Sequence, residues 1–289
     1  MTGTGRRIIV RRPGALTTVQ DGGRPGLAHL GVPRSGALDR AAHARANRLV
    51  GNAPSMPVLE TTLDGVSLRF TAGAVVAVTG AVAPVHIDGR PAGWSEPLPV
   101  GAGQTLEVGR AVRGVRSYVA VGGGVLVPSV LGSSSRDVLS GLGPAPLAAG
   151  DELGIGAHHG RFVPVDLAPY PLPPDGTAEL VLWPGPRHDW LSDAGAATLA
   201  AGRWTVSPDS NRVALRLVGP PVQRSRHDEL PSEGIVLGSV QSLPDGGLVV
   251  FLADHPTTGG YPVVAVVDPP SLDACAQARP GTVVSFRLR

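Results

Sequence analysis

The densest group of residues able to do chemistry lies near the C-terminus, in the segments 229–247 and 251–262. Asp254 and His255 directly follow an apolar run, and a Thr-Thr-Gly-Gly turn comes next. Such a turn after a buried strand can bind a carboxylate, a phosphate or an oxyanion through hydroxyl and backbone N–H groups. The alternative is an ordinary turn with a hydrogen-bonded structural histidine. We predict that Asp254 and His255 are catalytic and that eight neighbours bind substrate: Ser232, Glu233, Gln241, Thr257, Thr258, Gly259, Gly260 and Tyr261.

A second polar segment covers residues 17–52. Asp39, His43 and Asn47 follow one another at intervals of four residues, so a helix over 37–50 places them in one polar line beside an apolar stripe. In one interpretation, Asp39 orients or polarises His43 for acid–base catalysis, and His43 and Asn47 bind a small polar substrate. In the other, the line is the solvated face of a surface helix.

Four further residues of this half of the chain are candidates. Asp21 and Arg24 form either an ion pair that stabilises a turn or a clamp for a carboxylate or an amide. We group them with Gln20 as substrate-binding residues. Glu60 lies between apolar residues in VLETTLDG (58–65). A buried acid needs a partner, so Glu60 is either the structural partner of an arginine or a catalytic group in a cleft.

The elements that must position these residues are mainly β-strands. Apolar and polar residues alternate with the period of a half-buried strand over 66–70, 105–108, 212–217 and 284–289. Continuous apolar runs indicate strands buried on both faces at 74–78, 180–183, 248–253 and 263–267. Turn dipeptides such as Asp88-Gly89 and Asp245-Gly246 separate the runs.

Helical periodicity is clear only at 37–50, where we expect Ser35 to cap the start of the helix. Residues 188–201 and 271–278 are shorter helical candidates. A Pro-rich stretch at 165–176 is typical of a linker. We therefore expect two mainly β domains, of barrel or sandwich type, over residues 1–170 and 177–289.

The composition excludes several kinds of catalysis. All 25 basic residues are arginine, so the chain has no lysine to form a Schiff base, to serve a Walker-A loop or to carry biotin. Its single cysteine, Cys275, excludes an internal disulfide and a cysteine-cluster metal site. No other spacing predicts a metal site, and the nucleophile motif G-x-S-x-G is missing. We expect Cys275 to be a core residue.

The charge and the apolar pattern bear on location and partners. The formal net charge is only +2 and the arginines are dispersed, which argues against nucleic-acid binding. No stretch reaches the roughly 18 apolar residues of a membrane span, and the first residues lack the apolar core of a signal peptide. We therefore expect a cytoplasmic protein with no membrane association.

Several long blocks together resemble one family. They are residues 13–52, 58–63, 207–221, 229–246 and 252–267, which include VQDGGRPGLAHLGVPRSGALDRAAHARANRLVGN, SPDSNRVALRLVGPP and LADHPTTGGYPVVAVV. The family is the biotin-dependent carboxyltransferase family, whose members are also called allophanate hydrolase subunit 2 or the C-type 5-oxoprolinase subunit. The resemblance implies cyclophilin-like β-barrel subdomains with a few short helices.

The resemblance also implies partners and a reaction. It implies a complex with a subunit 1 homologue (the B-type 5-oxoprolinase subunit, or Kip-type inhibitor) and a third, A-type 5-oxoprolinase subunit. That complex hydrolyses the lactam of 5-oxoproline to glutamate at the expense of ATP, which is used at the level of the complex. One alternative is the carboxyltransferase component of a urea carboxylase, with biotin carried elsewhere because this chain has no lysine. Another is a non-enzymatic antagonist of a kinase inhibitor.

Overall fold

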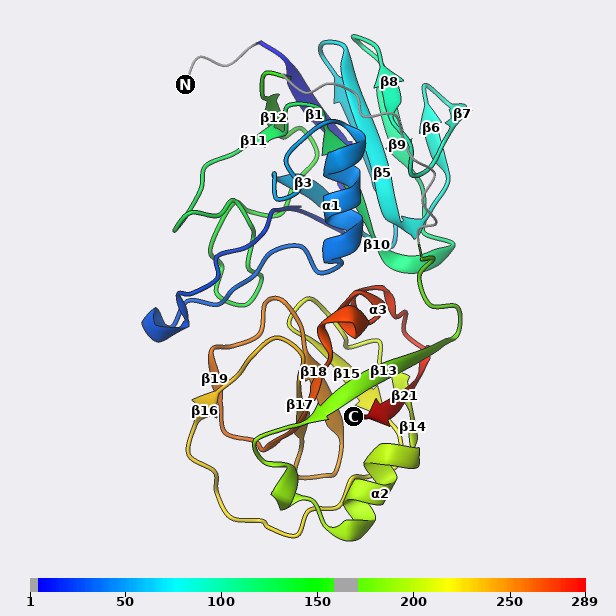
Figure 1. The fold of residues 1–289 in the computed structure, drawn as a ribbon. Helices are drawn as coiled ribbons and strands as arrows, with labels where there is room; N and C mark the ends of the chain where they lie inside the picture. Colours follow the sequence, from blue (N-terminus) through cyan, green and yellow to red (C-terminus); the bar gives the residue numbers. More distant parts are fainter. Residues whose placement is uncertain (1–4, 159–170) are drawn as a thin grey trace. The chain divides into compact units, whose positions relative to one another are not determined.

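The computed structural model describes residues 5–158 and 171–289, and these form two compact units (Figure 1). The first unit consists of Met1–Arg24, Asp39–Arg136 and Gly141–Pro173. The second consists of Pro174–Arg289 together with two short segments of the N-terminal half, Pro25–Leu38 and Asp137–Ser140. The chain crosses between the units several times. Its last crossing lies between residues 173 and 174, within the stretch predicted to be a linker. Residues 165–170 of that stretch lie outside the described residues.

Two β-sheets make up the first unit. One has seven strands, in the order β11 (Val125–Leu126), β12 (Glu152–Ile155), β1 (Arg7–Arg12), β4 (Val66–Phe70), β9 (Thr105–Val108), β6 (Val85–Ile87) and β7 (Arg90–Ala92). The other has five, in the order β2 (Leu16–Gln20), β3 (Val58–Thr62), β10 (Arg113–Val121), β5 (Ala74–Val82) and β8 (Leu98–Val100). The paired strands of both sheets are antiparallel.

A single apolar core joins these sheets. Leu68 and Phe70 of β4 pack in one buried cluster with Val76 and Val78 of β5. The period-2 residues Val66, Leu68 and Phe70 of β4 are buried as predicted, and β5, predicted from its continuous apolar run, is buried along most of its length. The Asp88-Gly89 turn joins β6 to β7, and both residues have positive φ, 49° and 74°. This backbone suits the right-handed twist of a two-residue hairpin.

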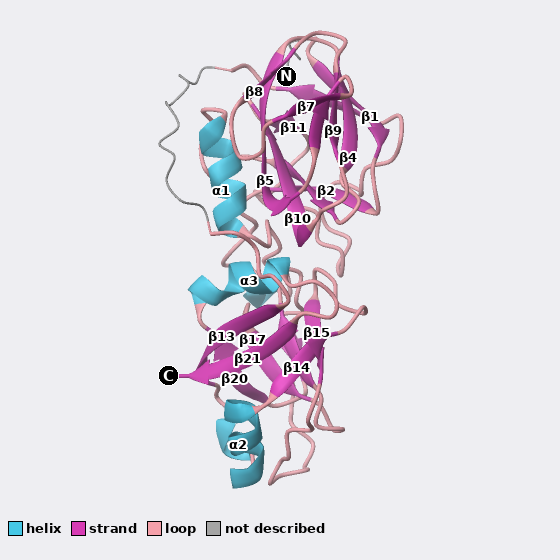
Figure 2. Ribbon diagram, turned by 90° about the vertical axis from the view of Figure 1, so that its right-hand side faces the viewer, coloured by secondary structure: helices cyan, strands magenta, loops and turns pink. Residues whose placement is uncertain are grey.

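Helix α1 (Arg40–Leu49) packs on β5 and β10 of the five-stranded sheet (Figures 1 and 2). Its N-cap is Asp39, whose carboxylate accepts a hydrogen bond from Ala42 N at 2.8 Å. Ser35 is not the cap, so that prediction was wrong. His43 and Asn47 are buried, so the polar line faces the sheet and is not the solvated face of a surface helix.

A closed seven-stranded barrel forms most of the second unit. Its order is β13 (Thr177–Pro184), β20 (Val263–Val267), β17 (Ser239–Ser242), β18 (Leu248–Phe251), β15 (Ala214–Val218), β14 (Arg203–Val206) and β21 (Val283–Leu288). The parallel pairing of β13 with β21 closes it, and the other pairs are antiparallel. Closure leaves no edge strand exposed in the barrel. A separate two-stranded ribbon joins β16 (Glu233–Gly234) to β19 (Thr258–Gly259).

The barrel is filled by apolar side chains and flanked by helices. Trp204 and Phe286 lie in its core with ring centroids 4.9 Å apart. Helices α3 (Leu272–Gln277) and α2 (Asp193–Ala201) lie at opposite ends of it (Figure 2). The short 3-10 turns are η1 (Ala28–Leu30), η2 (His188–Trp190) and η3 (Pro269–Ser271). The prediction of a mainly β chain with a barrel and few short helices is confirmed. No helix in the described part of the chain is long and apolar enough to cross a membrane.

A buried ion pair ties the two inserted segments to the barrel. Arg212 and Asp254 have side chains 1% and 0% exposed, and Arg212 contacts the carboxylate through Nε at 2.9 Å and Nη2 at 3.0 Å. Ser35 Oγ donates to Asp254 Oδ1 at 2.8 Å, and Val138 N donates to Oδ2 at 3.0 Å. Arg212 also donates to Gly36 O at 2.7 Å. One ion pair therefore holds both segments.

Removal of one charge of this pair should be costly. We expect Asp254→Asn to lower the free energy of unfolding by about 3–5 kcal/mol, because Arg212 is left buried without its counter-charge. Urea unfolding measures the loss. The matched control is Glu179→Gln in the exposed Glu179–Arg287 pair, where we expect at most about 1 kcal/mol. Equal losses in the two variants would contradict the role given to the buried pair.

Gly65 and Gly103 of the first unit both have a positive φ, but only Gly65 is closely packed, so the two allow the cost of close packing to be compared with that of backbone strain. Gly65 and Gly103 have φ of 67° and 82°, but a Cβ on Gly65 would lie 2.0 Å from Val108 O, whereas one on Gly103 meets nothing within 4 Å. We expect Gly103→Ala to cost about 1 kcal/mol and Gly65→Ala on the order of 3 kcal/mol in thermal unfolding. A smaller cost at Gly65 than at Gly103 would show that the backbone there can move aside.

Candidate functional site

The Asp21 carboxylate is the centre of a buried polar site in the first unit. It follows β2 and accepts four hydrogen bonds: from Gly23 N at 2.8 Å, Ser133 Oγ at 2.6 Å, Ser134 N at 2.6 Å and Ser135 Oγ at 2.5 Å. Its own N–H donates to Ser135 Oγ at 2.9 Å. The serine run at 133–135 is thereby fixed against the end of β2. Asp21 consequently holds a loop and does not form the ion pair with Arg24 that the sequence suggested as one option.

Gln20 and Arg24 are held by consecutive carbonyls of that serine-containing loop. Gln20 Nε2 donates to Arg136 O at 2.9 Å, and Arg24 Nη2 donates to Ser135 O at 2.6 Å. Both residues are buried, with 0% and 2% exposure. Gln20 Oε1 and Arg24 Nη1 have no hydrogen-bond partner within residues 5–158 and 171–289. A buried polar atom without a partner is costly, so Gln20 Oε1 and Arg24 Nη1 are an unused acceptor and an unused donor.

His43 and Asn47 converge on one carbonyl. His43 Nε2 lies 3.0 Å from Met56 O, and Asn47 Nδ2 donates to the same oxygen at 2.9 Å. Burial lowers the pKa of His43, opposed by the Met56 carbonyl and by the charges of Glu60 and Asp21. The ring is therefore neutral at neutral pH and donates from Nε2. It also lies close to Asp21 and Glu60.

Glu60 is buried in β3 and has the arginine partner that the sequence allowed. Its Oε1 lies 3.7 Å from Arg116 Nε, and the two side chains are 1% and 7% exposed. Tyr118 is its cross-strand neighbour on β10. Burial, with Glu60 and Asp39 nearby, raises the pKa of Tyr118 well above its ordinary value. Tyr118 OH accepts from Asp39 N at 2.8 Å, which links the start of α1 to β10.

The first unit thus gathers the predicted residues of its half of the chain into one buried polar region. Hydrogen bonds or electrostatic interactions connect them to one another or to a shared segment. These residues are Gln20, Asp21, Arg24, Asp39, His43, Asn47 and Glu60.

The predicted residues of the second unit divide into two groups. Asp254 is saturated by Arg212, Ser35 and Val138, a geometry that favours positioning over proton transfer. His255 follows it and is 6% exposed. Burial lowers the pKa of His255. This first group is buried beside the inserted segments.

The second group lies in or beside the β16–β19 ribbon, and its members range from the buried Gln241 to the exposed Tyr261. Glu233 is paired with Arg187 through both carboxylate oxygens, and Gln241 Nε2 donates to Tyr261 O at 2.9 Å. Both side chains are therefore used within the chain. The remaining members lie in or beside β19 or just before β16, and their binding roles stay predictions: Ser232, Thr257, Thr258, Gly259, Gly260 and Tyr261.

The sequence did not indicate the hydrogen-bond partners that hold three of these acids in place. Ser133–Ser135, Tyr118 and Arg212 were not candidates, yet they hold Asp21, Asp39 and Asp254. One signal was available for the serines: three consecutive hydroxyl residues between glycine and arginine, in LGSSSRD (131–137). Nothing local marked Arg212 among 25 arginines.

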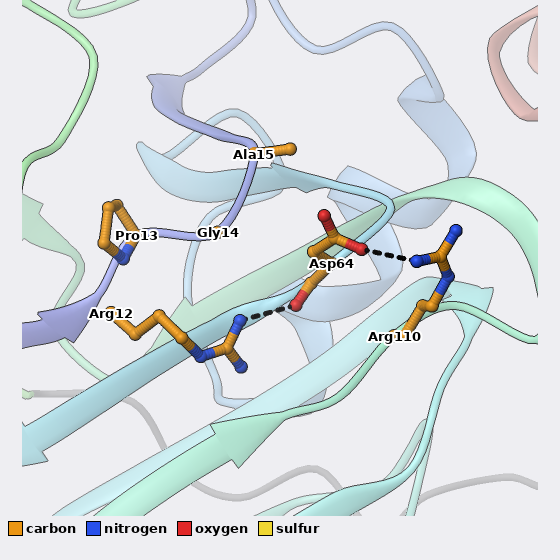
Figure 3. A pocket seen from close by; sticks show the side chains of 6 residues that line it. All are labelled: Arg12, Pro13, Gly14, Ala15, Asp64 and Arg110. Atoms are coloured by element: carbon orange, nitrogen blue, oxygen red, sulfur yellow. Dashed lines mark hydrogen bonds and ion pairs between the residues drawn. The ribbon is translucent and has the colours of Figure 1, made fainter.

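A shallow surface cavity of about 550 Å³ lies elsewhere on the first unit (Figure 3). It is lined by Arg12, Pro13, Gly14, Ala15, Asp64 and Arg110. Asp64 is already paired there, through its carboxylate with Arg110 at 3.3 Å and through its carbonyl with Arg12 at 2.8 Å. None of the predicted site residues lines this cavity, so we do not place the site there.

Neither the cysteine nor a cluster of metal-binding side chains provides a second candidate site in the described part of the chain. Cys275 is buried in the barrel core, and burial raises the pKa of its thiol to about 12. It is a core residue, as predicted, because a thiol with such a pKa is not a nucleophile at neutral pH. Within the described ranges, no group of three or more His, Cys, Asp or Glu side chains is placed to hold a metal ion.

Comparisons with known proteins agree with this architecture. The chain is 36% identical over 291 residues to the C-type 5-oxoprolinase subunit of Escherichia coli, covering 96% of this chain and 90% of that protein. The crystal structure of TTHA0988 matches with a TM-score of 0.86 and 37% identity, over 97% of this chain and 55% of the other. That of K. lactis urea amidolyase matches with a TM-score of 0.91 and 30% identity, over 97% of this chain.

The two solved structures are much longer proteins. The chain spans about half the length of TTHA0988 and 18% of the K. lactis urea amidolyase chain. The family model for the carboxyltransferase domain, subdomains A and B, matches residues 30–288. The chain therefore belongs to the carboxyltransferase domain family, and the resemblance found in its sequence is confirmed.

Proposed function

We propose that this chain is a subunit of an ATP-dependent 5-oxoprolinase complex, which hydrolyses the lactam of 5-oxoproline to L-glutamate. The observation that carries the proposal is the match to the C-type 5-oxoprolinase subunit of E. coli over nearly the full length of both proteins. A protein with that name implies further subunits. We take these to be a subunit 1 homologue, which is the B-type 5-oxoprolinase subunit, and an A-type one.

The unpartnered atoms of the first unit fit this substrate. The N–H group of 5-oxoproline can donate a hydrogen bond to Gln20 Oε1. Its carboxylate can accept one from Arg24 Nη1. An arginine held by one of its two terminal nitrogens presents the other in a fixed direction. The two side chains would orient the planar ring, while burial strengthens both contacts.

Neighbouring groups would supply acid–base chemistry. Ring opening breaks the amide C–N bond, adds water oxygen to the carbonyl carbon and places a proton on the departing nitrogen. Among the acids, the charge of Glu60 acts most strongly on the His43 and Tyr118 rings. We propose Glu60 as the acid–base group beside the lactam, with Asp39 and His43 fixing Tyr118 and the end of β2. ATP activates the amide at the level of the complex, and we assign its binding to the partner chains.

Carboxyl transfer is the second candidate, favoured by the structural match to K. lactis urea amidolyase. Urea has N–H groups and a carbonyl but no carboxylate, so it uses Gln20 and leaves Arg24 less well matched. Biotin, when bound, supplies the carboxyl group. Its carrier lysine must lie on another chain or domain, because this chain has no lysine.

Reconstitution separates the two reactions. We expect this chain, mixed with its A-type and B-type partner chains, to release glutamate from 5-oxoproline in step with ADP formation, and we expect omission of the chain to abolish release. An enzyme-coupled glutamate assay measures it. Carboxylation of urea by a biotin-carrying partner, with no glutamate from 5-oxoproline, would replace the first proposal with the second.

Substrate recognition by Arg24 has a direct test. Lysine keeps a charge and one bond to Ser135 but loses the planar second donor, so we expect Arg24→Lys to raise the KM for 5-oxoproline about tenfold or more, consistent with loss of a charged hydrogen bond. We expect the KM for ATP to stay unchanged. Arg216→Lys, at an exposed arginine, is the control. Equal KM values for 5-oxoproline in both variants would remove Arg24 from the site.

A further inference from the structure

Thr18 is a buried residue of β2 whose hydroxyl group is only half used. The residue is 1% exposed. Its Oγ1 accepts a hydrogen bond from Gln20 Nε2 at 2.9 Å. A hydroxyl group can donate one hydrogen bond while it accepts others, but the hydroxyl hydrogen of Thr18 has no acceptor within residues 5–158 and 171–289. Thr18 is therefore a buried donor that the chain itself does not use.

The same hydrogen bond helps to fix the side-chain amide of Gln20. Its Nε2 has two hydrogens, which it donates to Thr18 Oγ1 and Arg136 O, both at 2.9 Å. A carbonyl oxygen can only accept, so the nitrogen faces Arg136 and the amide cannot be reversed. Gln20 Oε1 is left as an acceptor with no partner in the described part of the chain. An unused donor and an unused acceptor thus belong to two side chains that one hydrogen bond joins.

These two side chains lie on the polar face of the five-stranded sheet. Residues two positions apart in a strand point to the same face, so Thr18 and Gln20 share one. Thr18 pairs directly with Glu60 of β3, and Glu60 pairs with Tyr118 of β10. Side chains opposite each other in this way have Cβ atoms about 5 Å apart. The unused donor therefore lies next to Glu60, the proposed acid–base group.

We propose that Thr18 and Gln20 bind one edge of a cis amide, with the Thr18 hydroxyl donating to the carbonyl oxygen and Gln20 Oε1 accepting from the N–H. A small lactam ring holds its amide cis, so both groups lie on the same edge of the ring. The role in turnover rests on the proposed lactam hydrolysis. There, the carbonyl oxygen gains negative charge as water adds, and a donor placed on it stabilises that state most.

A purely structural role does not account for the Thr18 hydroxyl. Valine has the same shape and would fill the same space without a buried donor that lacks an acceptor. Thr17, the preceding residue, provides the contrast. It is also 1% exposed, but its hydroxyl donates to Pro13 O at 2.6 Å and is used within the chain. Its side chain points to the opposite face of β2.

Two small rings test the amide edge without turnover. 2-Pyrrolidinone and γ-butyrolactone both have a ring carbonyl, but only 2-pyrrolidinone has an N–H. In NMR titrations of the full chain, we expect 2-pyrrolidinone to shift the side-chain amide signals of Gln20, assigned with Gln20→Glu. We expect it to bind about tenfold more tightly than γ-butyrolactone, as for one buried hydrogen bond. Equal affinities for the two rings, or no binding of 2-pyrrolidinone, would overturn the proposal.

Matched variants test the donor. Thr18→Val keeps the shape and removes the hydroxyl, so we expect the affinity for 2-pyrrolidinone to fall about tenfold. Thr18→Ser keeps the hydroxyl and should restore most of that affinity. Thr17→Val is the control, because it makes the same change at an equally buried threonine of the same strand. If Thr18→Val binds 2-pyrrolidinone as tightly as Thr17→Val does, Thr18 is not the donor.

The last readout uses the reconstituted complex. We expect Thr18→Val to lower kcat for 5-oxoproline by about a hundredfold, the scale for loss of one donor to a developing oxyanion, and Thr18→Ser to recover most of it. The KM for ATP should not change. Unaltered kcat in Thr18→Val would overturn the role in turnover. If the wild-type complex releases no glutamate, the proposed function fails, while the titrations with the two rings still decide whether Thr18 and Gln20 bind an amide edge.

Discussion

The carboxylate of Asp21 is the interaction on which the site of the first unit depends. Four donors saturate it, and three of them come from a run of serines more than a hundred residues later in the chain. Because that run is fixed, the carbonyls of Ser135 and Arg136 are in place to hold Arg24 and Gln20. A carboxylate that the sequence suggested as part of a substrate clamp therefore positions other groups. Buried carboxylates saturated by the chain's own donors are well suited to this task.

In the second unit, too, a buried carboxylate positions other groups, but its main donor is an arginine and not a run of serines. Asp254 receives a bidentate arginine and, with its remaining lone pairs, fixes one residue from each inserted segment. A pair that is buried and fully hydrogen-bonded offsets its desolvation, whereas the loss of either partner does not. The chain passes from the serine run, which Asp21 holds in the first unit, into Asp137–Ser140 of the second unit, where Val138 N donates to Asp254.

Local pattern predicted most of the fold but only part of the site. Periodicity predicted the strands over 66–70 and 263–267 and the helix over 37–50. It could do so because the residues that are buried together in one element are also close together in the sequence. The contacts of Asp21 and Asp254 span over a hundred and over forty residues, and no local rule selects a partner at that range. Ser35 was expected to cap a helix, but it adopts a φ of 52° and donates to Asp254.

The inserted segments have a consequence for how such proteins arise. A gene cut between residues 173 and 174 would give a barrel without two pieces of its own compact unit, so the barrel is not a separable module. A gene fusion that keeps both units intact therefore has to carry the two together. The match to the K. lactis urea amidolyase agrees with this expectation, because it covers 97% of this chain and 18% of that much longer one.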